Sequence, residues 1–230
     1  MPHAKDYYDK EGAAMNKEMI ATTERFLKDT FDKSAYLKEH PAEGDYRLEH
    51  SYRVANIAKQ IAEAEGFDVT QAVIAGLLHD IAYCEEMVSR EDRMNHGRRS
   101  AAIARPFLEG LGLSADTVNE ICYGIAIHVD DEADFQWERT AFCETVGDAD
   151  NIDRFDAYRI YDTLRWIKFN EMNLLEKQEK VASTIGRLTG YKDMKMGTVT
   201  AKNHWLQRLD YYIGFYEKLK SQLESSTEIR

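Results

Sequence analysis

The stretch from Ala72 to Ala82 is the feature that most limits how this chain can fold. It is apolar nearly all round a helix, which is typical of a helix buried in the middle of a bundle. Only His79 and Asp80 interrupt the apolar character. A carboxylate in such surroundings is costly unless a cation or a metal ion pairs with it. The two residues therefore predict either a metal site or a buried salt bridge.

Helical periodicity dominates the rest of the chain, and three prolines leave room for long helices. We therefore expect an all-α, multi-helix bundle that forms a single domain over residues 1–230, because no linker or repeat divides it. The first expected parts are an N-terminal helix through Met19 and Phe31, a loop with His40, Pro41 and Gly44, and a helix from Tyr46 to Gly66. Next come a helix capped by Asp68 and a helix over Arg98 to Gly110 that Pro106 kinks or breaks. The last are a helix capped by Ser114 with His128 at its end, and a helix from Thr140 that holds Asp148, Asp150 and Asp153.

The C-terminal third continues the helical pattern. Tyr158, Tyr161, Leu164 and Trp166 are predicted packing positions. Residues 186–203 contain two glycines among polar residues, which indicates a surface loop or a lid. The amphipathic stripe from Trp205 to Leu223 is expected to be core or a dimer surface, so a homodimer is possible.

Charge limits the class of partner. The chain is 43% hydrophobic and 31% charged, with a formal net charge of -11. Such a balance disfavours anionic membranes and duplex nucleic acid, which are bound by an excess of Lys and Arg. Bound divalent cations would still supply positive charge locally, so phosphate chemistry remains compatible with this acidity.

Cysteine spacing indicates the compartment. Cys84, Cys122 and Cys143 are odd in number and far apart, which predicts reduced thiols. The segment from Met1 to Lys10 is polar and lacks the apolar core of a signal peptide. We expect a cytoplasmic protein with no membrane insertion.

Several motifs together carry a resemblance. Taken singly, histidines such as His50, His96 and His128 are more often ordinary surface or half-buried residues, and an aspartate such as Asp150 is more often a helix cap or a solvated carboxylate. However, the order Arg47-Leu-Glu-His50-Ser, Gly76-Leu-Leu-His79-Asp80 and Gly147-Asp-Ala-Asp150 resembles the HD-domain superfamily of metal-dependent phosphohydrolases. The resemblance covers about residues 47–155, as the HD-like core of the domain.

The resemblance implies a set of metal ligands. His50, His79, Asp80 and Asp150 match the positions that ligate a first ion. His96 and His128 are similar to the extra histidines of members that hold two ions. Asp150 is preferred to Asp148, which could instead cap the helix or orient a ligand histidine. Imidazole and carboxylate ligands accept manganese, iron, zinc, cobalt or nickel, so one or two such divalent ions are expected.

The resemblance also implies a reaction, the hydrolysis of a small phosphorylated metabolite by metal-activated water, with a nucleotide as the leading candidate. Asp80 would be catalytic. Some members carry an acidic residue three places after the His-Asp pair, but this chain has Tyr83 there, which leaves Glu85 and Glu86 as candidates for the leaving-group acid. The expected substrate-binding cations are Arg47, Arg98 and Arg99. The alternatives are a di-iron oxygenase of the same fold and a non-catalytic regulatory protein stabilised by its metal.

Overall fold

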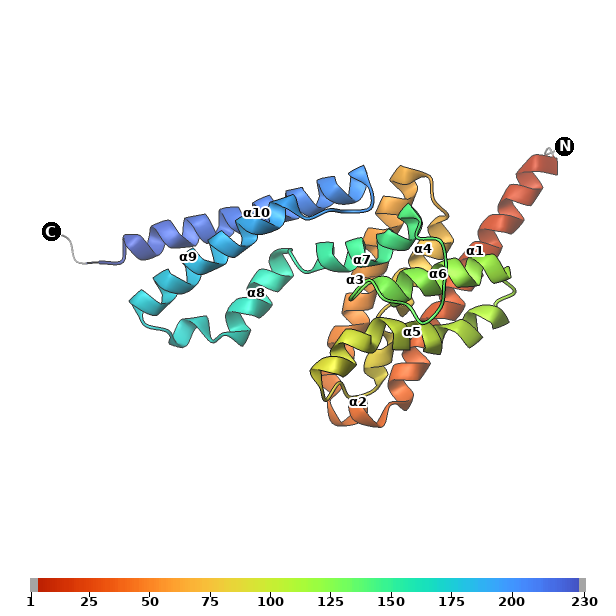
Figure 1. Ribbon diagram of the computed structural model, residues 1–230, viewed down its shortest axis with the longest axis horizontal. Coiled ribbons are helices and arrows are strands. Elements are labelled where there is room, and N and C mark those ends of the chain that lie inside the picture. The colour runs from red at the N-terminus through yellow and green to blue at the C-terminus, as the bar shows by residue number, and fades with distance from the viewer. Residues whose placement is uncertain (1–3, 228–230) are drawn as a thin grey trace. The chain divides into compact units, whose positions relative to one another are not determined.

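The computed structural model describes residues 4–227, with side chains from residue 14 onward, and every element in that range is a helix (Figure 1). The α-helices are α1 (Ala4–Lys33), α2 (Ala35–Glu39), α3 (Pro41–Glu65), α4 (Val69–Leu78), α5 (Arg90–Gly110), α6 (Ala115–Ile127), α7 (Ala141–Asp153), α8 (Ala157–Trp166), α9 (Leu174–Gly190) and α10 (Val199–Glu224). Three short 3-10 helices, η1 (Ile81–Cys84), η2 (Phe169–Glu171) and η3 (Tyr191–Asp193), join them. The predicted all-α fold class is confirmed.

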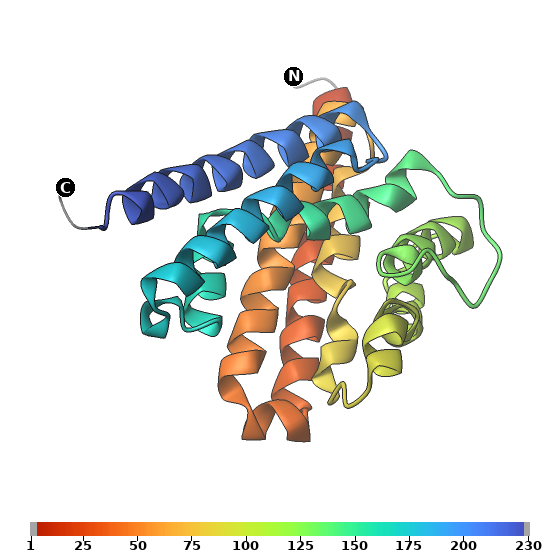
Figure 2. The ribbon, with the colours of Figure 1, turned by 60° about the vertical axis from the view of Figure 1, so that its left-hand side comes forward.

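The chain has two compact units, Met1–Asp150 and Asn151–Arg230. In the first unit α3 packs against α4 and α5 against α6, while α4 also contacts α1 and α6 (Figure 2). The second unit holds α8, α9 and α10. That residues 1–230 behave as a single domain stays a prediction.

Side-chain caps fix several helix starts. The Asp68 carboxylate accepts a hydrogen bond from the backbone N–H of Gln71 at 2.9 Å, and the Ser114 hydroxyl accepts one from Thr117 at 3.1 Å. Both caps were predicted, because an oxygen at this position satisfies a backbone donor that the first helical turn leaves unpaired. Gly66 ends α3 in the left-handed conformation, with φ of 76°.

Two helices start earlier than the sequence predicted. The expected loop of His40, Pro41 and Gly44 is wrong, because Pro41 opens α3 at the first helical position, where its missing N–H costs nothing. The helix predicted from Arg98 starts at Arg90, after a capping box formed by Ser89 and Asp92. Pro106 lies inside this helix and does not end it.

The buried helix ends sooner than predicted. α4 stops at Leu78, His79 is its C-terminal cap, and Asp80 follows with φ of -107° before η1 begins. His79 and Asp80 therefore stand at a helix end and not inside a helix. This placement lets two consecutive side chains turn toward the same point, which a regular helix would hold about 100° apart.

In the second unit two predictions are wrong. The predicted loop over 186–203 is largely helical, because α9 runs to Gly190, η3 follows, and α10 begins at Val199. Tyr158, Tyr161 and Trp166 are 42%, 63% and 85% exposed and do not pack as expected, whereas Ile160 of α8 is buried. The long C-terminal helix is confirmed as α10, and its apolar stripe includes buried Trp205, whose ring lies 4.7 Å from that of Phe155.

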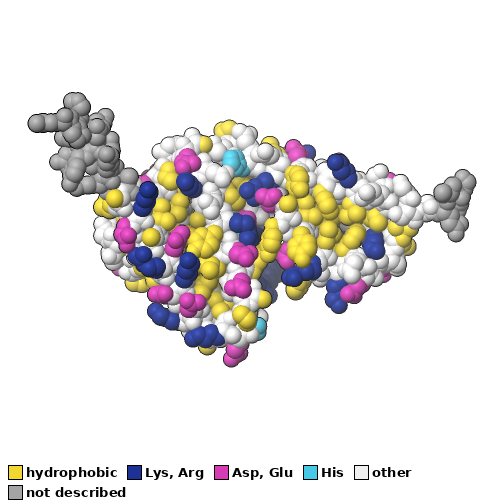
Figure 3. Space-filling view, turned by 180° about the vertical axis from the view of Figure 1, so that it is seen from behind, with side chains coloured by type: hydrophobic (Ala, Val, Ile, Leu, Met, Phe, Trp, Pro, Cys, Tyr) yellow, Lys and Arg dark blue, Asp and Glu magenta, His cyan; other side chains and the backbone are white. Residues whose placement is uncertain are grey.

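The surface charges and the cysteines agree with what the composition predicted. In the view of Figure 3, Lys and Arg side chains are interspersed with Asp and Glu and form no basic field. All three cysteines are free, as predicted. Within the described part of the chain, none of the helices combines the length and apolar character that a bilayer span requires.

Gly76 sets the distance between α3 and α4. A Cβ added there would lie 2.7 Å from the Cα of Ala55 and 3.0 Å from its backbone nitrogen, closer than a carbon can approach. We expect Gly76→Ala to lower the free energy of unfolding by about 1–3 kcal/mol, because the two backbones must separate. Urea unfolding would measure this. Gly44→Ala is the matched control, since a Cβ at Gly44 meets its nearest atom at an ordinary 3.6 Å, and an equal loss in both variants would contradict the packing argument.

Candidate metal centre

The structure brings the six predicted ligands together within the first unit. His50 comes from α3, His79 from the end of α4, and Asp80 from the residue after it. His96 lies on α5, His128 at the end of α6, and Asp150 on α7. The six residues span a hundred positions in sequence, so only the helix packing can make them neighbours.

The first group is His50, His79 and Asp80, whose ligand atoms all lie within 4.8 Å of one another. The Nε2 atoms of His50 and His79 are 3.3 Å apart. Asp150 joins this group, because its Oδ1 lies 3.1 Å from Nε2 of His50. Asp148 is buried on the same helix, and the preference for Asp150 over Asp148 as the ligand stays a prediction.

The second group is Asp80, His96 and His128. Asp80 Oδ1 lies 3.0 Å from Nε2 of His96 and 3.7 Å from Nε2 of His128. The two Nε2 atoms are 3.1 Å apart. Asp80 therefore belongs to both groups, and its carboxylate stands between the two pairs of histidines.

Each of three histidines is oriented by its own helix. The Nδ1–H of His79 donates to the carbonyl of Gly76 at 2.8 Å, that of His96 to Arg93 at 2.6 Å, and that of His128 to Ile125 at 2.7 Å. A carbonyl can only accept, so Nδ1 carries the proton. In the neutral ring Nε2 is then a lone pair directed into the cluster, which is the form that binds a metal ion.

The donor set fits divalent metal ions. Two imidazole nitrogens about 2.0–2.1 Å from one ion would lie about 2.9–3.4 Å apart at octahedral to tetrahedral angles. The separations of 3.3 Å and 3.1 Å in the two histidine pairs fall within that range. Carboxylate oxygens lie beside each pair. The predicted cluster that could hold metal is therefore present, while the role of each residue as a ligand stays a prediction.

The electrostatics favour ionised carboxylates. Burial alone would raise the pKa of Asp80, but the neighbouring His79, His128 and His96 hold it well below its usual range. In the same way His50 outweighs burial and lowers the pKa of Asp150. The buried carboxylate of Asp80 and the half-buried carboxylate of Asp150 are therefore both negatively charged groups that attract a cation.

Arg47 lies at the edge of this cluster. Its Nη1 is 3.2 Å from Asp80 Oδ2, and its guanidinium stacks 3.3 Å from the ring centroid of Tyr83. Its Nε is buried and has no hydrogen-bond partner among the described residues. The predicted substrate-binding Arg47 is thus next to the centre, with a donor still to be satisfied.

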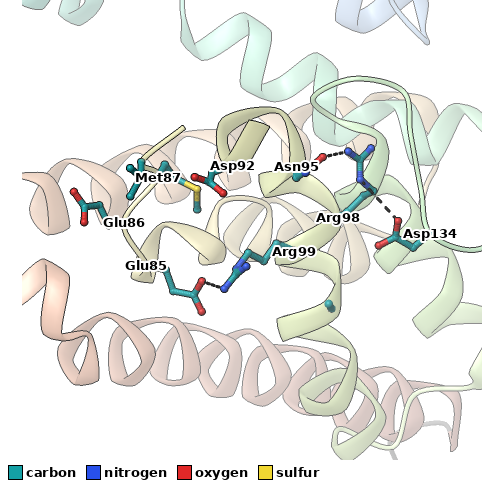
Figure 4. Close-up of a pocket in the computed structure, with 10 residues that line it drawn as sticks. Glu85, Glu86, Met87, Asp92, Asn95, Arg98, Arg99 and Asp134 are labelled. Atoms are coloured by element: carbon teal, nitrogen blue, oxygen red, sulfur yellow. Dashed lines mark hydrogen bonds and ion pairs between the residues drawn. The ribbon is translucent and has the colours of Figure 1, made fainter. Parts of the chain in front are cut away.

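The other predicted substrate and acid residues lie beside the cluster and not in it. Arg98 donates to both oxygens of Asp130 at 3.0 and 3.1 Å, and Arg99 is ion-paired with Glu85. Glu85, Glu86, Arg98 and Arg99 line one cavity, shown in Figure 4. No contact between these four side chains and the six clustered residues is recorded in the described range, so their predicted roles stay predictions.

Sequence reasoning missed two residues. Asp130 anchors Arg98, and because Arg98 follows His96 by two residues and Asp130 follows His128 by two, this pair ties α5 to the end of α6. Tyr83 supports both Arg47 and His96, whose ring centroid is 5.0 Å from its own. The sequence held a signal for Asp130, because Arg98 and Asp130 each follow a histidine by two residues. It held none for Tyr83, whose contacts with Arg47 and His96 are visible only in the folded structure.

The pH dependence of stability tests the burial of His79. Burial lowers the pKa of its imidazole to about 4, although Asp80 opposes the shift. An unfolded histidine titrates near 6.5, so below that pH the unfolded chain binds a proton that folded His79 does not. For metal-free protein we expect the free energy of unfolding to fall by up to about 3 kcal/mol from this group as pH drops from 6.5 to 4.

Urea unfolding of metal-free wild type and His79→Asn at several pH values checks this. The variant lacks the titrating group and should lose less stability across the same window. His128 acts with the opposite sign, because the Asp80 carboxylate outweighs burial and raises its pKa. Its contribution is complete below pH 6.5 and is lost above it. Identical curves for both proteins between pH 6.5 and 4 would contradict the assignment to His79.

Comparison with known families adds to this geometry. Residues 47–158 match the family model of the HD domain. A segment of 85 residues is 38% identical to Ribonuclease Y 1 of Pediococcus pentosaceus. That segment is 37% of this chain but spans only 15% of that enzyme's length.

Solved structures of other proteins are similar to this chain over most of its length. A predicted HD superfamily hydrolase from an uncultured Thermotogales bacterium has a TM-score of 0.62 and 20% identity, over 88% of this chain and 91% of that one. Bacillus subtilis YpgQ has a TM-score of 0.60 and 19% identity, over 90% and 96% of the two chains. Its complex with ADP gives 0.56 and 15% over the same shares. At identities this low, the structural similarity shows a shared fold and nothing further.

Proposed function

Because residues 47–158 match the HD-domain family model, we propose that this chain is a metal-dependent phosphohydrolase of that superfamily, acting on a small phosphorylated metabolite with a nucleotide as the leading candidate. The observation that carries the proposal is the convergence of four histidines and two aspartates from five helical segments. Such a set of nitrogen and oxygen donors is suited to divalent transition metals such as manganese, iron, zinc, cobalt or nickel.

His50, His79, Asp80 and Asp150 would hold one ion, and Asp80, His96 and His128 the other. A divalent ion there supplies a Lewis acid for phosphoryl oxygens and lowers the pKa of bound water. The chain itself supplies orientation. Three imidazoles are fixed by their own helices, and Asp80 remains ionised beside them, so the donors are placed before any ligand arrives.

Arg47 is the residue we assign to the phosphate. Its guanidinium is anchored on Asp80 Oδ2 and stacked on Tyr83, and its buried Nε keeps a free donor. A guanidinium fixed in this way can donate to a phosphate oxygen without losing much side-chain freedom. The stacking also explains why Tyr83 suits this position, since an acidic side chain there would offer no aromatic face.

A nucleotide is supported by two relatives. The name of Ribonuclease Y 1 describes an enzyme that acts on RNA, and YpgQ has been solved with ADP. Both facts belong to those proteins, and a nucleotide substrate for this chain is our inference. The face seen in Figure 3 carries mixed charges, and the formal net charge of the chain is -11, which disfavours a long duplex, so a small substrate is the better match.

Phosphate release tests the proposal. Protein stripped of metal and refilled with manganese, zinc or iron would be assayed against a panel of nucleotides and small phosphoesters. We expect metal-dependent turnover in wild type and none in a His79→Ala, Asp80→Ala variant. Stoichiometric metal binding without turnover on any substrate would count against the proposal, and oxygen-dependent activity of the iron form would favour the oxygenase alternative.

A further inference from the structure

A cavity of about 520 Å³ lies within the first unit (Figure 4). Its wall holds four carboxylates, Glu85, Glu86, Asp92 and Asp134, and two guanidinium groups, Arg98 and Arg99. The volume is within the range of about 300–1,000 Å³ that small-ligand sites occupy. It is therefore large enough for the non-reacting part of a small substrate.

The wall is made from segments that each follow a clustered residue. Glu85 comes after Asp80 by way of η1, Arg98 lies two residues beyond His96 on α5, and Asp134 lies six beyond His128. The ion pair of Arg98 with Asp130 joins two of these segments. The cavity therefore lies between the segment after η1, α5 and the loop after α6, three segments that are each continuous in sequence with a clustered residue.

The charges of the cavity argue against a phosphate group inside it. Arg98 already donates to both oxygens of Asp130 and to the side-chain oxygen of Asn95, and Arg99 is paired with Glu85. Both guanidinium groups are therefore neutralised by the protein. The wall has four carboxylates against these two cations, so an anion placed there would meet net repulsion.

The same wall suits an uncharged, hydrogen-bonding ligand. Carboxylates only accept hydrogen bonds, so they match a molecule rich in O–H and N–H donors. Met87, Val88 and Ala102 add an apolar part to the wall, against which a flat ring could pack. A nucleoside has both features, with sugar hydroxyls, amino groups and an aromatic base.

We infer that this cavity binds the uncharged nucleoside end of the substrate, while the phosphate lies at the His/Asp centre. The inference rests on the proposed function for the placement of the phosphate. It also reassigns Arg98 and Arg99, which the sequence suggested as phosphate ligands, to the wall of the nucleoside site, where ion pairs hold them.

Ala102→Trp tests this by filling the cavity from an exposed position of α5. Glu109→Trp is the matched control, because it is exposed on the same helix, seven residues further along, and does not line the cavity. For the manganese-loaded full chain we expect Ala102→Trp to raise KM for nucleotides about tenfold or more, on the scale of a steric mismatch in a pocket. KM for p-nitrophenyl phosphate, which has no nucleoside, should stay unchanged.

Binding of free nucleosides separates this inference from the proposed reaction. Calorimetric titration of the full chain with adenosine, guanosine, cytidine or uridine, up to about 10 mM to include a site with a Kd near 1 mM, needs no turnover. We expect saturable binding of at least one nucleoside in wild type and Glu109→Trp, and its loss in Ala102→Trp. Nucleoside binding without phosphate release would overturn the reaction but keep the cavity assignment. Binding by none of them, or equal binding by both variants, would overturn the cavity assignment even if phosphate is released.

Discussion

Replacing Asp80 with alanine should remove both metal ions and reduce turnover by more than about 100-fold, since loss of even an outer partner of a metal ligand costs about 10–100-fold. Asp80 is shared by the two groups. Its Oδ1 lies 3.0 Å from His96 and 3.6 Å from His79, and its Oδ2 lies 3.6 Å from His50. No other carboxylate in the described residues takes part in both recorded groups.

Metal content measured by elemental analysis, beside phosphate release, checks this prediction. His96→Ala should lose the second ion and keep the first, because His96 belongs to one group only. Asp45→Ala, an exposed aspartate near the start of α3, should keep both. An Asp80→Ala protein that still binds two ions per chain would show that the ions bind elsewhere.

The experiment also separates a metal centre from a plain hydrogen-bond network. The separations of 3.1 Å and 3.3 Å between histidine nitrogens also suit N–H···N hydrogen bonds. Because Nδ1 of His96 and of His128 already donates to a carbonyl, such a bond between these two rings requires one of them to carry protons on both nitrogens. A network of that kind would need no ion. Wild-type protein that binds no divalent metal at all would therefore support the regulatory or structural alternative, with the six residues acting as a buried polar network.

Local chemistry is the part of the fold that sequence could predict. The caps at Asp68 and Ser114 and the stop at Gly66 depend on a few neighbouring residues, and all three are confirmed. The wrong boundaries occur in polar stretches. The residues before Arg98 and those between α9 and α10 carry little apolar periodicity, so the hydrophobic pattern did not predict a helix there. The helices form in these stretches nevertheless, because capping bonds and packing stabilise them.

For the metal centre, the residue types in the sequence predicted the candidate ligands, but the spacing of these residues along the chain did not predict how close their side chains lie in the fold. Each of His79, His96 and His128 bonds to a carbonyl three residues back in its own helix, which is local and could be expected. That their Nε2 atoms point to one place depends on how α4, α5 and α6 pack. Arg98 and Arg99 form ion pairs with partners far away in sequence or across a loop, so the sequence did not reveal these pairings, and the role of the two arginines as phosphate ligands stays a prediction.

Gly97→Ala should damage both the stability of the first unit and the second metal site. A Cβ at Gly97 would lie 2.5 Å from the backbone oxygen of Ala126 and 3.1 Å from that of Ile125. These are backbone atoms of the last turn of α6, which cannot move aside as a side chain could. We expect the free energy of unfolding to fall by about 1–3 kcal/mol, the usual cost of overpacking, despite the better helix propensity of alanine.

The same shift should weaken metal binding, because the added Cβ would also lie 3.1 Å from Nδ1 of His128. That nitrogen donates to Ile125 and fixes the direction of Nε2. Separating α5 from α6 also lengthens the distance between His96 and His128, while His50 and His79 lie on other helices. Gly97→Ala should therefore keep the first ion and lose affinity for the second by about 10–100-fold, as measured by metal titration.

Gly110→Ala is the control for this prediction. It lies on the same helix, and a Cβ there meets nothing within 4 Å, so it should be neutral or gain up to about 1 kcal/mol. If Gly97→Ala lowered affinity for both ions equally, the two groups would respond as one unit, and the assignment of His96 and His128 to a separate second site would be wrong. Selective loss of the second ion would instead show that the close contact between α5 and α6 is needed to hold His96 and His128 in position.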